Sequence, residues 1–164
     1  MRPYPRLLAF QKHDCTEGLP KNVDFGHKLF IYRKGSVTPP HAHNNLVSAH
    51  LVVKGEIRVR TFDRVEDLDK ALLLRPTKDQ IEKVGSTISM SDYKDNVHWF
   101  EGMSDVSVSF DVPVPKIELN KKYLHEAEGY NQIFLDVSVA PRKDGLIEAP
   151  IIKFAESVKS MDNH

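Results

Sequence analysis

Residues 35–55 read GSVTPPHAHNNLVSAHLVVKG, a stretch in which His41 and His43 flank a single alanine. In an extended chain this spacing points both imidazoles to the same face, about 7 Å apart. Two imidazoles placed in this way suit neighbouring positions on one metal ion. The stretch opens on Gly35 and closes on Gly55, eleven residues after the pair, where a turn precedes the next apolar run. It therefore predicts strands that present a pair of metal ligands.

A second glycine-led stretch carries a third histidine. Gly85 is followed by an alternating segment, a polar loop over residues 91–96 and then His98, which enters an apolar run with Trp99 and Phe100. We expect His98 to reach the same ion as the pair. The alternative is that the pair lies in a loop after two prolines and that His98 is a hydrogen-bonded interior residue. The histidines in polar surroundings, which we expect to be ordinary solvated residues, are His13, His27, His125 and His164.

Short runs of alternating apolar and polar residues recur along the chain and predict strands with one buried face. In the clearest run, 106–112, we expect the apolar set to face the interior: Val106, Val108, Phe110 and Val112. Further strands are expected at 28–33, 46–54, 56–62, 71–74, 86–91, 97–101 and 133–139. The helical signal is limited to a turn near 65–73 and an amphipathic end at 154–161. Many short strands joined by tight turns indicate an all-β sandwich or barrel.

Length and composition exclude several classes of protein. The 164 residues suit one domain, and 23 basic residues balance 23 acidic ones, so no nucleic-acid or anionic-membrane partner is indicated. The single cysteine, Cys15, excludes a disulfide framework and fits a reducing compartment. The apolar run 7–10 is too short for a signal peptide or a membrane span. We therefore expect a cytoplasmic protein without a membrane partner.

The two histidine-bearing stretches resemble the paired motifs of the cupin superfamily, over about residues 35–115. The resemblance implies a double-stranded β-helix, the cupin jelly-roll barrel, with short peripheral helical segments. It implies one domain over residues 1–164, in which N-terminal strands (1–34) and a C-terminal extension (116–164) pack on or between barrels. It also implies a metal held by His41, His43 and His98, and a homodimer.

One departure from the cupin pattern sharpens the functional expectation. Ser48 stands where cupins usually place a glutamate ligand, so three neutral imidazoles would leave the charge of a divalent ion uncompensated and favour anionic ligands. Loss of this glutamate is also typical of thiol dioxygenases, which oxidise cysteine, cysteamine or N-terminal cysteine with ferrous iron and dioxygen. Segments 92–98 and 106–115 are similar to the second motif of the cysteamine and plant cysteine members. The resemblance therefore implies Fe(II), with Zn, Ni or Mn as alternatives.

Three further residues are candidates for catalysis. His50 lies two residues after Ser48, so in a strand both side chains point to the same face. There His50 would be a fourth ligand, a hydrogen-bond donor to a ligand, a proton carrier or a plain interior residue. Tyr93 and Asp95 lie in the loop before the third histidine, and Asp95 is a further candidate to complete the metal site. Glu101 has the opposite strand parity to that histidine, which disfavours it. The candidates for the family's substrate-carboxylate arginine and late tyrosine are Arg33, Tyr123 and Tyr130.

Taken together, these features predict a metal-dependent cupin, an Fe(II) dioxygenase that acts on a small anionic or thiol substrate with dioxygen as its second substrate. Apolar walls that would exclude water from the site are expected from Val52, Met90, Phe100 and Phe110. The alternatives are a non-oxidative metal cupin, such as an isomerase, decarboxylase or hydrolase, and a small-molecule-binding cupin without turnover.

Overall fold

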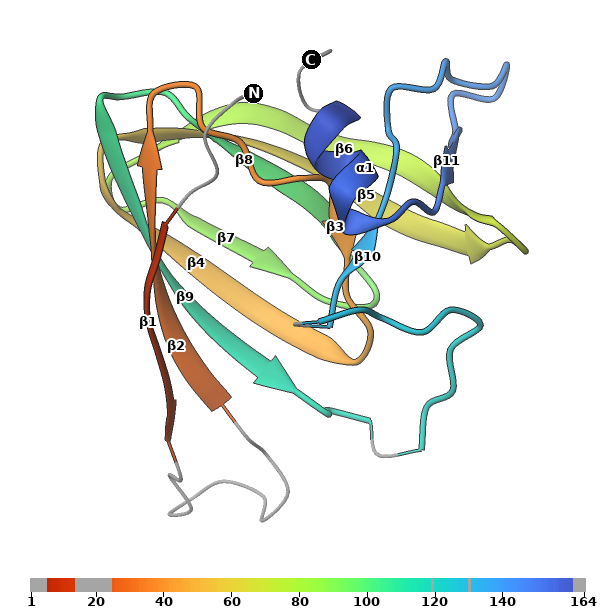
Figure 1. Ribbon diagram of the computed structural model, residues 1–164, viewed down its shortest axis with the longest axis horizontal. Coiled ribbons are helices and arrows are strands. Elements are labelled where there is room, and N and C mark those ends of the chain that lie inside the picture. The colour runs from red at the N-terminus through yellow and green to blue at the C-terminus, as the bar shows by residue number, and fades with distance from the viewer. Residues whose placement is uncertain (1–5, 14–24, 119, 130, 161–164) are drawn as a thin grey trace.

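Antiparallel strands make up most of the molecule, and one short helix follows them (Figure 1). The computed structural model describes residues 6–13, 25–118, 120–129 and 131–160. In chain order the elements are β1 (Arg6–His13), β2 (Phe25–Arg33), β3 (His41–Ala42), β4 (Leu46–Lys54), β5 (Glu56–Asp67), β6 (Ala71–Lys83), β7 (Thr87–Met90), β8 (Val97–Gly102), β9 (Val106–Pro115), β10 (Ile133–Phe134), β11 (Ile147–Pro150) and α1 (Phe154–Ser160).

The strands form two sheets that enclose a common interior. One sheet, sheet A, has the order β1-β2-β9-β4-β7, and the other, sheet B, has the order β10-β3-β8-β5-β6-β11. From β2 to β9 the chain switches sheet at every connection except the β5–β6 hairpin, as Figure 1 shows. An eight-stranded core of this order, β2-β9-β4-β7 against β3-β8-β5-β6, is a jelly roll. The expected all-β jelly-roll fold is confirmed.

An apolar cluster fills the space between the two sheets. On β4 the inner positions are Leu46, Ser48, His50 and Val52, all buried, and the residues between them are exposed. This period of two is what the sequence predicts for the strand. The cluster contains Tyr32, Val52, Ile57, Val59, Ile88, Met90 and Phe100. Each such side chain contributes roughly 1.5–3 kcal/mol by leaving water, so the interior holds the two sheets together.

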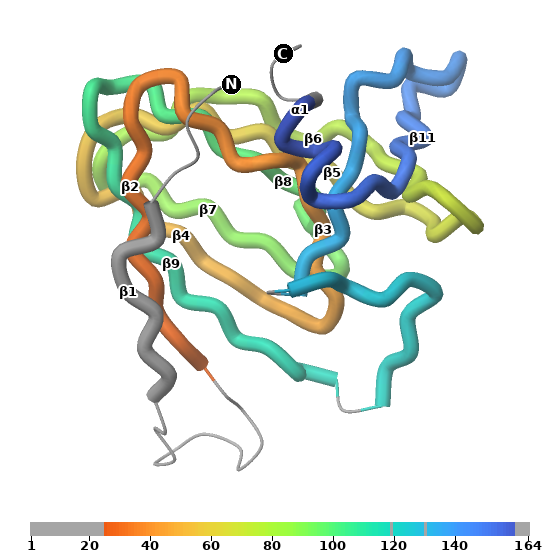
Figure 2. Tube along the Cα trace, viewed as in Figure 1, coloured from red at the N-terminus to blue at the C-terminus, as the bar shows by residue number. Residues whose placement is uncertain are grey.

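The C-terminal extension covers the outer face of sheet B. β10 pairs with β3 and β11 pairs with β6, and Figure 2 shows this blue part of the chain running along the sheet. The outer apolar cluster includes Trp99, which stacks on Phe62 at 5.4 Å between ring centroids, and Leu135 from the extension. Because both faces of β8 are covered, Val97–Phe100 are all buried. The extension therefore packs on its own barrel.

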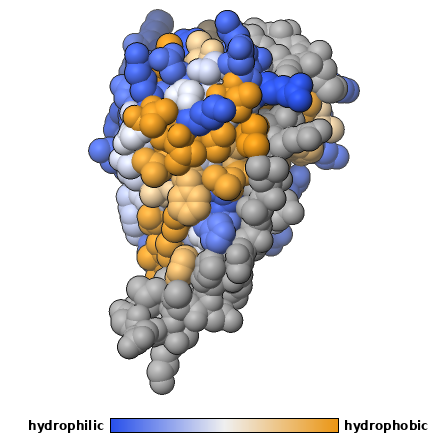
Figure 3. Space-filling view, turned by 90° about the vertical axis from the view of Figure 1, so that its left-hand side faces the viewer, coloured by the Kyte–Doolittle hydropathy of each residue, from blue (hydrophilic) through white to orange (hydrophobic). Residues whose placement is uncertain are grey.

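The outer face of sheet A is apolar, and this corrects one expectation. On β9 the buried residues are Ser107, Ser109, Asp111 and Pro113, whereas Val106 is exposed and the other apolar residues are only partly buried. The strand therefore turns its polar side inward. Ser107 Oγ donates to the Glu56 carbonyl at 2.6 Å and Asp111 accepts from the Ser48 hydroxyl, whereas the Ser109 hydroxyl has no hydrogen-bond partner in the described part of the chain. Figure 3 shows hydrophobic side chains gathered on this side of the molecule.

Two further expectations about elements were wrong. The helical turn near 65–73 is absent: these residues belong to the β5–β6 hairpin, whose strands end at Asp67 and begin again at Ala71. Register shifts within this hairpin, at Thr61/Phe62 and Arg64/Glu66, interrupt the alternation that would have marked a long strand. The strand expected at 133–139 is only the two-residue β10. The helix expected at 154–161 is confirmed as α1.

No helix among the described residues has the length and apolar character needed to span a membrane.

Candidate metal centre

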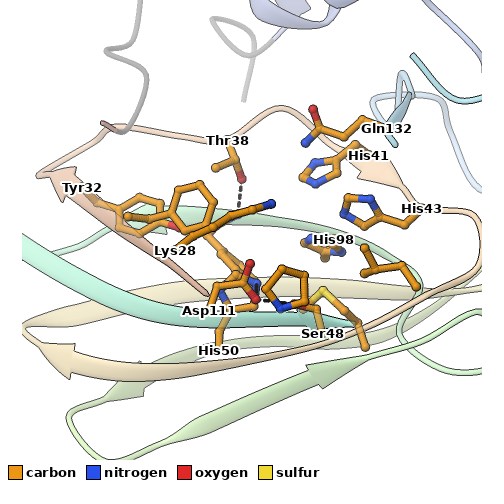
Figure 4. A pocket seen from close by; sticks show the side chains of 15 residues that line it. Lys28, Tyr32, Thr38, His41, His43, Ser48, His50, His98, Asp111 and Gln132 are labelled. Carbon is orange, nitrogen blue, oxygen red and sulfur yellow. Dashed lines mark hydrogen bonds and ion pairs between the residues drawn. The ribbon is translucent and has the colours of Figure 1, made fainter. Parts of the chain in front are cut away.

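Three histidines converge between the two sheets. His41 lies on β3, His43 follows that strand, and His98 lies directly opposite His41 on the neighbouring strand β8. The centroid of the His41 ring lies 4.8 Å from that of His43 and 4.4 Å from that of His98. The ring centroids of His43 and His98 are 5.3 Å apart. Each ring offers one nitrogen as a ligand atom, and these three nitrogens lie within 4.8 Å of one another. The three rings that the sequence spacing singled out are thus close enough to share an ion (Figure 4).

Backbone carbonyls fix the orientation of all three rings. Nδ1 of His41 lies 2.7 Å from the Pro39 carbonyl oxygen, and Nδ1 of His98 lies 3.1 Å from the Asn96 carbonyl oxygen. Nδ1 of His43 lies 2.6 Å from the carbonyl oxygen of Asn131, which the C-terminal extension supplies. A carbonyl can only accept, so each Nδ1 carries the proton and each Nε2 keeps its lone pair. This is the tautomer that a metal-binding histidine needs.

The electrostatics of the cluster favour neutral rings. Burial lowers the pKa of His41 to about 4, and the hydrogen bond to Pro39 only partly opposes it. Burial and then the charge of His41 lower the pKa of His43 and of His98 well below the usual value. At neutral pH the three rings therefore present unprotonated nitrogens, the form that binds a metal ion. The donor set fits a divalent metal held by three imidazoles.

Sheet A supplies a second polar group that faces the histidines. Lys28 on β2, Asp111 on β9 and His50 on β4 occupy directly opposed positions on three adjacent strands. We call these three residues the cross-strand row. His50 Nε2 lies 3.3 Å from Asp111 Oδ1, and the Ser48 hydroxyl donates to the same carboxylate oxygen. The row thus places one ammonium, one carboxylate and one imidazole opposite the cluster.

His50 belongs to the site but not to the three-histidine group. Its ring lies 6.4 Å from the His98 ring and edge-on to Phe100 at 4.8 Å. Its Nδ1 is buried and has no hydrogen-bond partner in the described part of the chain. Burial lowers the pKa of His50, although the Asp111 carboxylate raises it, so the ring is neutral at neutral pH. Ser48, which replaces the usual glutamate, holds Asp111 instead of facing the cluster as a ligand.

A small cavity separates the histidine cluster from the cross-strand row (Figure 4). Its volume is about 60 Å³, enough for a few water molecules or a small ligand. Apolar walls come from Phe30, Tyr32, Leu46, Met90, Phe100 and Pro113. Gln132 from the C-terminal extension closes it beside His41. Of the four apolar wall residues expected from the sequence, Met90 and Phe100 line the cavity, and Val52 packs in the interior cluster. Phe110 instead faces outward, with its ring centroid 5.8 Å from that of His27.

The structure does not bring Tyr93 or Asp95 to this cavity. The Tyr93 side chain is 75% exposed, and its hydroxyl donates to Glu118 on the surface. Asp95 is buried, but its Oδ1 accepts hydrogen bonds from the hydroxyls of Thr61 at 2.8 Å and Thr77 at 2.5 Å. Both residues precede His98 in sequence, yet the loop points them away from the metal cluster.

The remaining candidates also lie elsewhere. Arg33 is exposed at the end of β2, and Glu101 is not among the residues that line the cavity. The Tyr123 hydroxyl donates to the Asp92 carboxylate, and burial together with this contact raises the pKa of Tyr123 to about 12. Tyr130 lies outside the described residues.

Sequence reasoning missed Lys28, Asp111 and Gln132. The signal for Asp111 was present, because it lies on the polar face of β9, but that face was assigned to solvent. Lys28 gave no comparable signal, because one lysine in a strand is ordinarily a surface residue.

No protein-family model matches the sequence, and no curated protein matches it. Among solved structures, an oxalate oxidase has 20% sequence identity and a TM-score of 0.40, over 57% of this chain and 41% of that one. KdgF from Halomonas sp. has 14% identity and a TM-score of 0.43, over 64% and 86% of the two chains. Drosophila melanogaster CENP-C bound to CAL1 has 14% identity and a TM-score of 0.44, over 65% and 76%.

This chain thus spans less than half the length of the oxalate oxidase chain. Because all three TM-scores lie below 0.5, the fold assignment rests on the strand order of this chain. That strand order and the three-histidine cluster, in which His41 and His98 are buried and His43 is partly buried, together define a cupin-like jelly-roll barrel with a candidate metal centre.

Proposed function

We propose that this protein is a metal-dependent cupin that works as an Fe(II) dioxygenase on a small thiol. The observation that carries the metal centre is the set of three Nδ1–carbonyl contacts, which leave three Nε2 lone pairs on rings that lie together. His41, His43 and His98 would hold the ion. When bound, ferrous iron supplies open positions for an anionic ligand and dioxygen, and the electrons with which dioxygen is activated.

The charge of the donor set supports an anionic substrate. Three neutral imidazoles leave both positive charges of a divalent ion uncompensated, in a cavity whose walls are largely apolar. A thiolate meets this requirement, because it is a soft anionic ligand. Apolar walls also keep bulk water from the reacting atoms.

The reaction that we propose needs no further reductant. A thiolate RS⁻ and one molecule of dioxygen give the sulfinate RSO₂⁻, so that the O–O bond breaks and both oxygen atoms bond to sulfur. The sulfur is oxidised and dioxygen is reduced in the same event. The thiol must first lose its proton, and we propose His50 as the acceptor. Its ring is neutral, its Nδ1 has no hydrogen-bond partner in the described part of the chain, and its Nε2 faces Asp111.

The decisive experiment combines metal content with dioxygen consumption. Protein purified without a metal-chelating tag is analysed for bound metals, and dioxygen uptake is then followed with cysteine, cysteamine, 3-mercaptopropionate and peptides with an N-terminal cysteine. We expect stoichiometric iron, and uptake with at least one thiol. His98→Ala should lose the iron and the uptake while its circular dichroism stays that of a β protein.

The matched control is His125→Ala. His125 lies outside the cluster, with its Nε2 2.7 Å from the Leu68 carbonyl oxygen, so this variant should keep both iron and uptake. Iron without uptake on any thiol would contradict the dioxygenase proposal.

The cross-strand row favours a second candidate, a non-oxidative metal cupin. A buried histidine beside a carboxylate can move a proton on a bound substrate, as isomerases and hydrolases require. Bound zinc, nickel or manganese, with no dioxygen consumption, would support this candidate over the first.

A further inference from the structure

His43 differs from the other two cluster histidines in what holds its backbone. His41 and His98 lie on paired strands, whereas His43 lies in the connection between β3 and β4. Its carbonyl oxygen accepts a hydrogen bond from the Asn96 side chain at 3.0 Å, and its ring nitrogen Nδ1 faces the carbonyl of Asn131. The position of this ring therefore depends on contacts that other parts of the chain supply.

Two asparagines join this connection to the C-terminal extension, and we call Asn44 and Asn131 the asparagine clasp. The Asn131 side chain donates to the Asn44 carbonyl at 2.5 Å, while the Asn131 carbonyl accepts from His43 at 2.6 Å. The Asn44 side chain donates to the His125 carbonyl at 2.9 Å and accepts from Arg64 at 2.8 Å. Because Asn44 is buried, breaking these bonds would leave polar groups without partners.

The backbone around Asn131 directs its carbonyl toward the cluster. Glu128 and Gln132 exchange two backbone hydrogen bonds, at 2.8 and 2.9 Å. Between them, Gly129 and Asn131 have φ values of 50° and 62°. Asparagine is one of the few residues with a side chain that adopt this left-handed region readily. The same turn thus aims the Asn131 carbonyl at His43 and brings Gln132 to the cavity.

We propose that the asparagine clasp positions the His43 ligand, and that docking of the C-terminal extension is coupled to metal binding. This inference rests on the proposed metal centre, but the contacts of the clasp belong to the chain itself. Neither asparagine is a metal ligand. They act through His43, because the carbonyl that they hold in place fixes the orientation and the tautomer of its ring.

Coupling of this kind is reciprocal. If the docked extension raises the affinity for a metal ion, the bound ion must stabilise the docked extension by the same factor. The outer hydrogen-bond partners of metal-binding histidines typically change metal affinity by about 10–100-fold. We therefore expect an effect of at least about tenfold in both directions.

The zinc affinity of clasp variants tests the first direction. Asn131→Gly removes the side-chain amide but keeps the left-handed backbone, so it should bind zinc at least tenfold more weakly than wild type in competition with a chromophoric chelator. Asn44→Ala, which loses both of its side-chain hydrogen bonds, should show the same weakening. The matched control is Asp136→Ala, which breaks contacts to Ser138 elsewhere in the extension and should bind zinc like wild type.

Hydrogen exchange tests the second direction, which a merely structural role would not affect. Zinc should slow exchange of the Glu128 and Gln132 amides at least tenfold in wild type, and this protection should be lost in Asn131→Gly. The Gly145 amide, which bonds to the Arg142 carbonyl in another turn of the extension, should exchange at the same rate with and without zinc.

The outcomes separate this inference from the proposed function. Wild-type zinc affinity in Asn131→Gly would overturn the positioning role, and so would equal exchange of the Gln132 amide with and without zinc. If Asn131→Gly does not fold, the zinc affinity of Asn44→Ala decides in the same way.

If the wild type binds no zinc, the metal function fails, and the His43 ring of metal-free protein is then observed by nitrogen NMR. A change from the Nδ1-protonated tautomer in wild type to a mixture of tautomers in Asn131→Gly would still support the clasp. An unchanged tautomer would overturn it.

Discussion

Hydrogen bonds to nearby carbonyls decide which nitrogen of each cluster histidine is free. In two of the three, the acceptor is the carbonyl two residues upstream: Pro39 for His41 and Asn96 for His98. Proline follows Pro39, which restricts that residue to extended conformations and so limits the directions its carbonyl can take. The ring of His41 is therefore oriented by its own local sequence. His43 differs, because its carbonyl partner is supplied by Asn131, 88 residues further along the chain.

Asp95 gives a prediction that separates a structural role from a catalytic one. Asp95→Ala removes the acceptor of the Thr61 and Thr77 hydroxyls, so we expect the free energy of unfolding to fall by about 2–3 kcal/mol. Iron content should not change. Asp95→Asn keeps an acceptor and tolerates the positive φ of 53°, so it should lose less. Urea unfolding and metal analysis of both variants provide the test, and loss of iron at unchanged stability would place Asp95 in the site after all.

The histidine cluster could be predicted from the sequence because its signal is local. His41 and His43 share a face through spacing alone, and His98 follows a second stretch of the same kind. Lys28 and Asp111 could not be assigned in the same way. Their role depends on which strands become neighbours, since they meet only through the β2–β9 register. The converse holds for Tyr93 and Asp95: they are close to His98 in sequence but do not line the cavity.

At the scale of elements, alternation located the strands but did not orient all of them. On β4 the buried face was predicted correctly, including His50. On β9 the more polar face is buried, where Asp111 lines the cavity and Ser107 bonds to the Glu56 carbonyl, and the valine face points outward. Hydrophobic alternation identifies the buried face only where the interior is apolar. A strand that passes a functional site therefore breaks the rule at that site.

Gly102 marks the place where β8 passes close to β2, and it gives a prediction about this packing. A Cβ at residue 102 would lie 2.4 Å from the Arg33 carbonyl oxygen and 2.8 Å from the Tyr32 Cβ. Gly102→Ala should therefore force the strands apart and lower the free energy of unfolding by about 3 kcal/mol. The control is Gly85→Ala, where φ is +89° but no atom lies within 4 Å, so that only about 1 kcal/mol of backbone strain is expected. Equal losses in urea unfolding would contradict the close approach.

The buried histidines should make the whole molecule sensitive to acid. The pKa of His41 falls from 6.5 in the unfolded chain to about 4 in the fold, so the unfolded state binds more protons between these values. The contribution of His41 to the free energy of unfolding is therefore fully present above pH 6.5 and is lost as the pH falls toward 4. The loss is roughly 3 kcal/mol for this residue alone. His43 and His98 shift in the same direction. The hydrogen bond from Arg58 lowers the pKa of Asp79 from 3.8, so the effect of Asp79 on stability falls below the pH range of about 4 to 6.5.

Urea unfolding of metal-free protein at pH 7.5, 6 and 5 checks this expectation. Wild type should lose stability at each step, and His41→Asn should lose less between the same pH values. His125→Asn, which changes a histidine outside the cluster, should follow the wild type. A wild-type stability that is the same at pH 5 and pH 7.5 would show that the cluster is protonated in the fold.

The two sheets differ in what covers their outer faces, and this difference predicts how the molecule assembles. The C-terminal extension covers sheet B, whereas on sheet A Val47, Leu51, Val53 and Val106 are each more than a third exposed. Among the outward side chains of β4 and β9, the one charged residue is Lys54 at the end of β4, so two copies can face each other through the rest of this surface without repulsion. We therefore expect a homodimer through this face, with twice the 18.7 kDa chain mass in light scattering. Leu51→Lys should give the single-chain mass, because Leu51 lies opposite Phe110 within the face. Val84→Lys, at an exposed turn, should remain dimeric, and a wild type of single-chain mass would contradict the pairing.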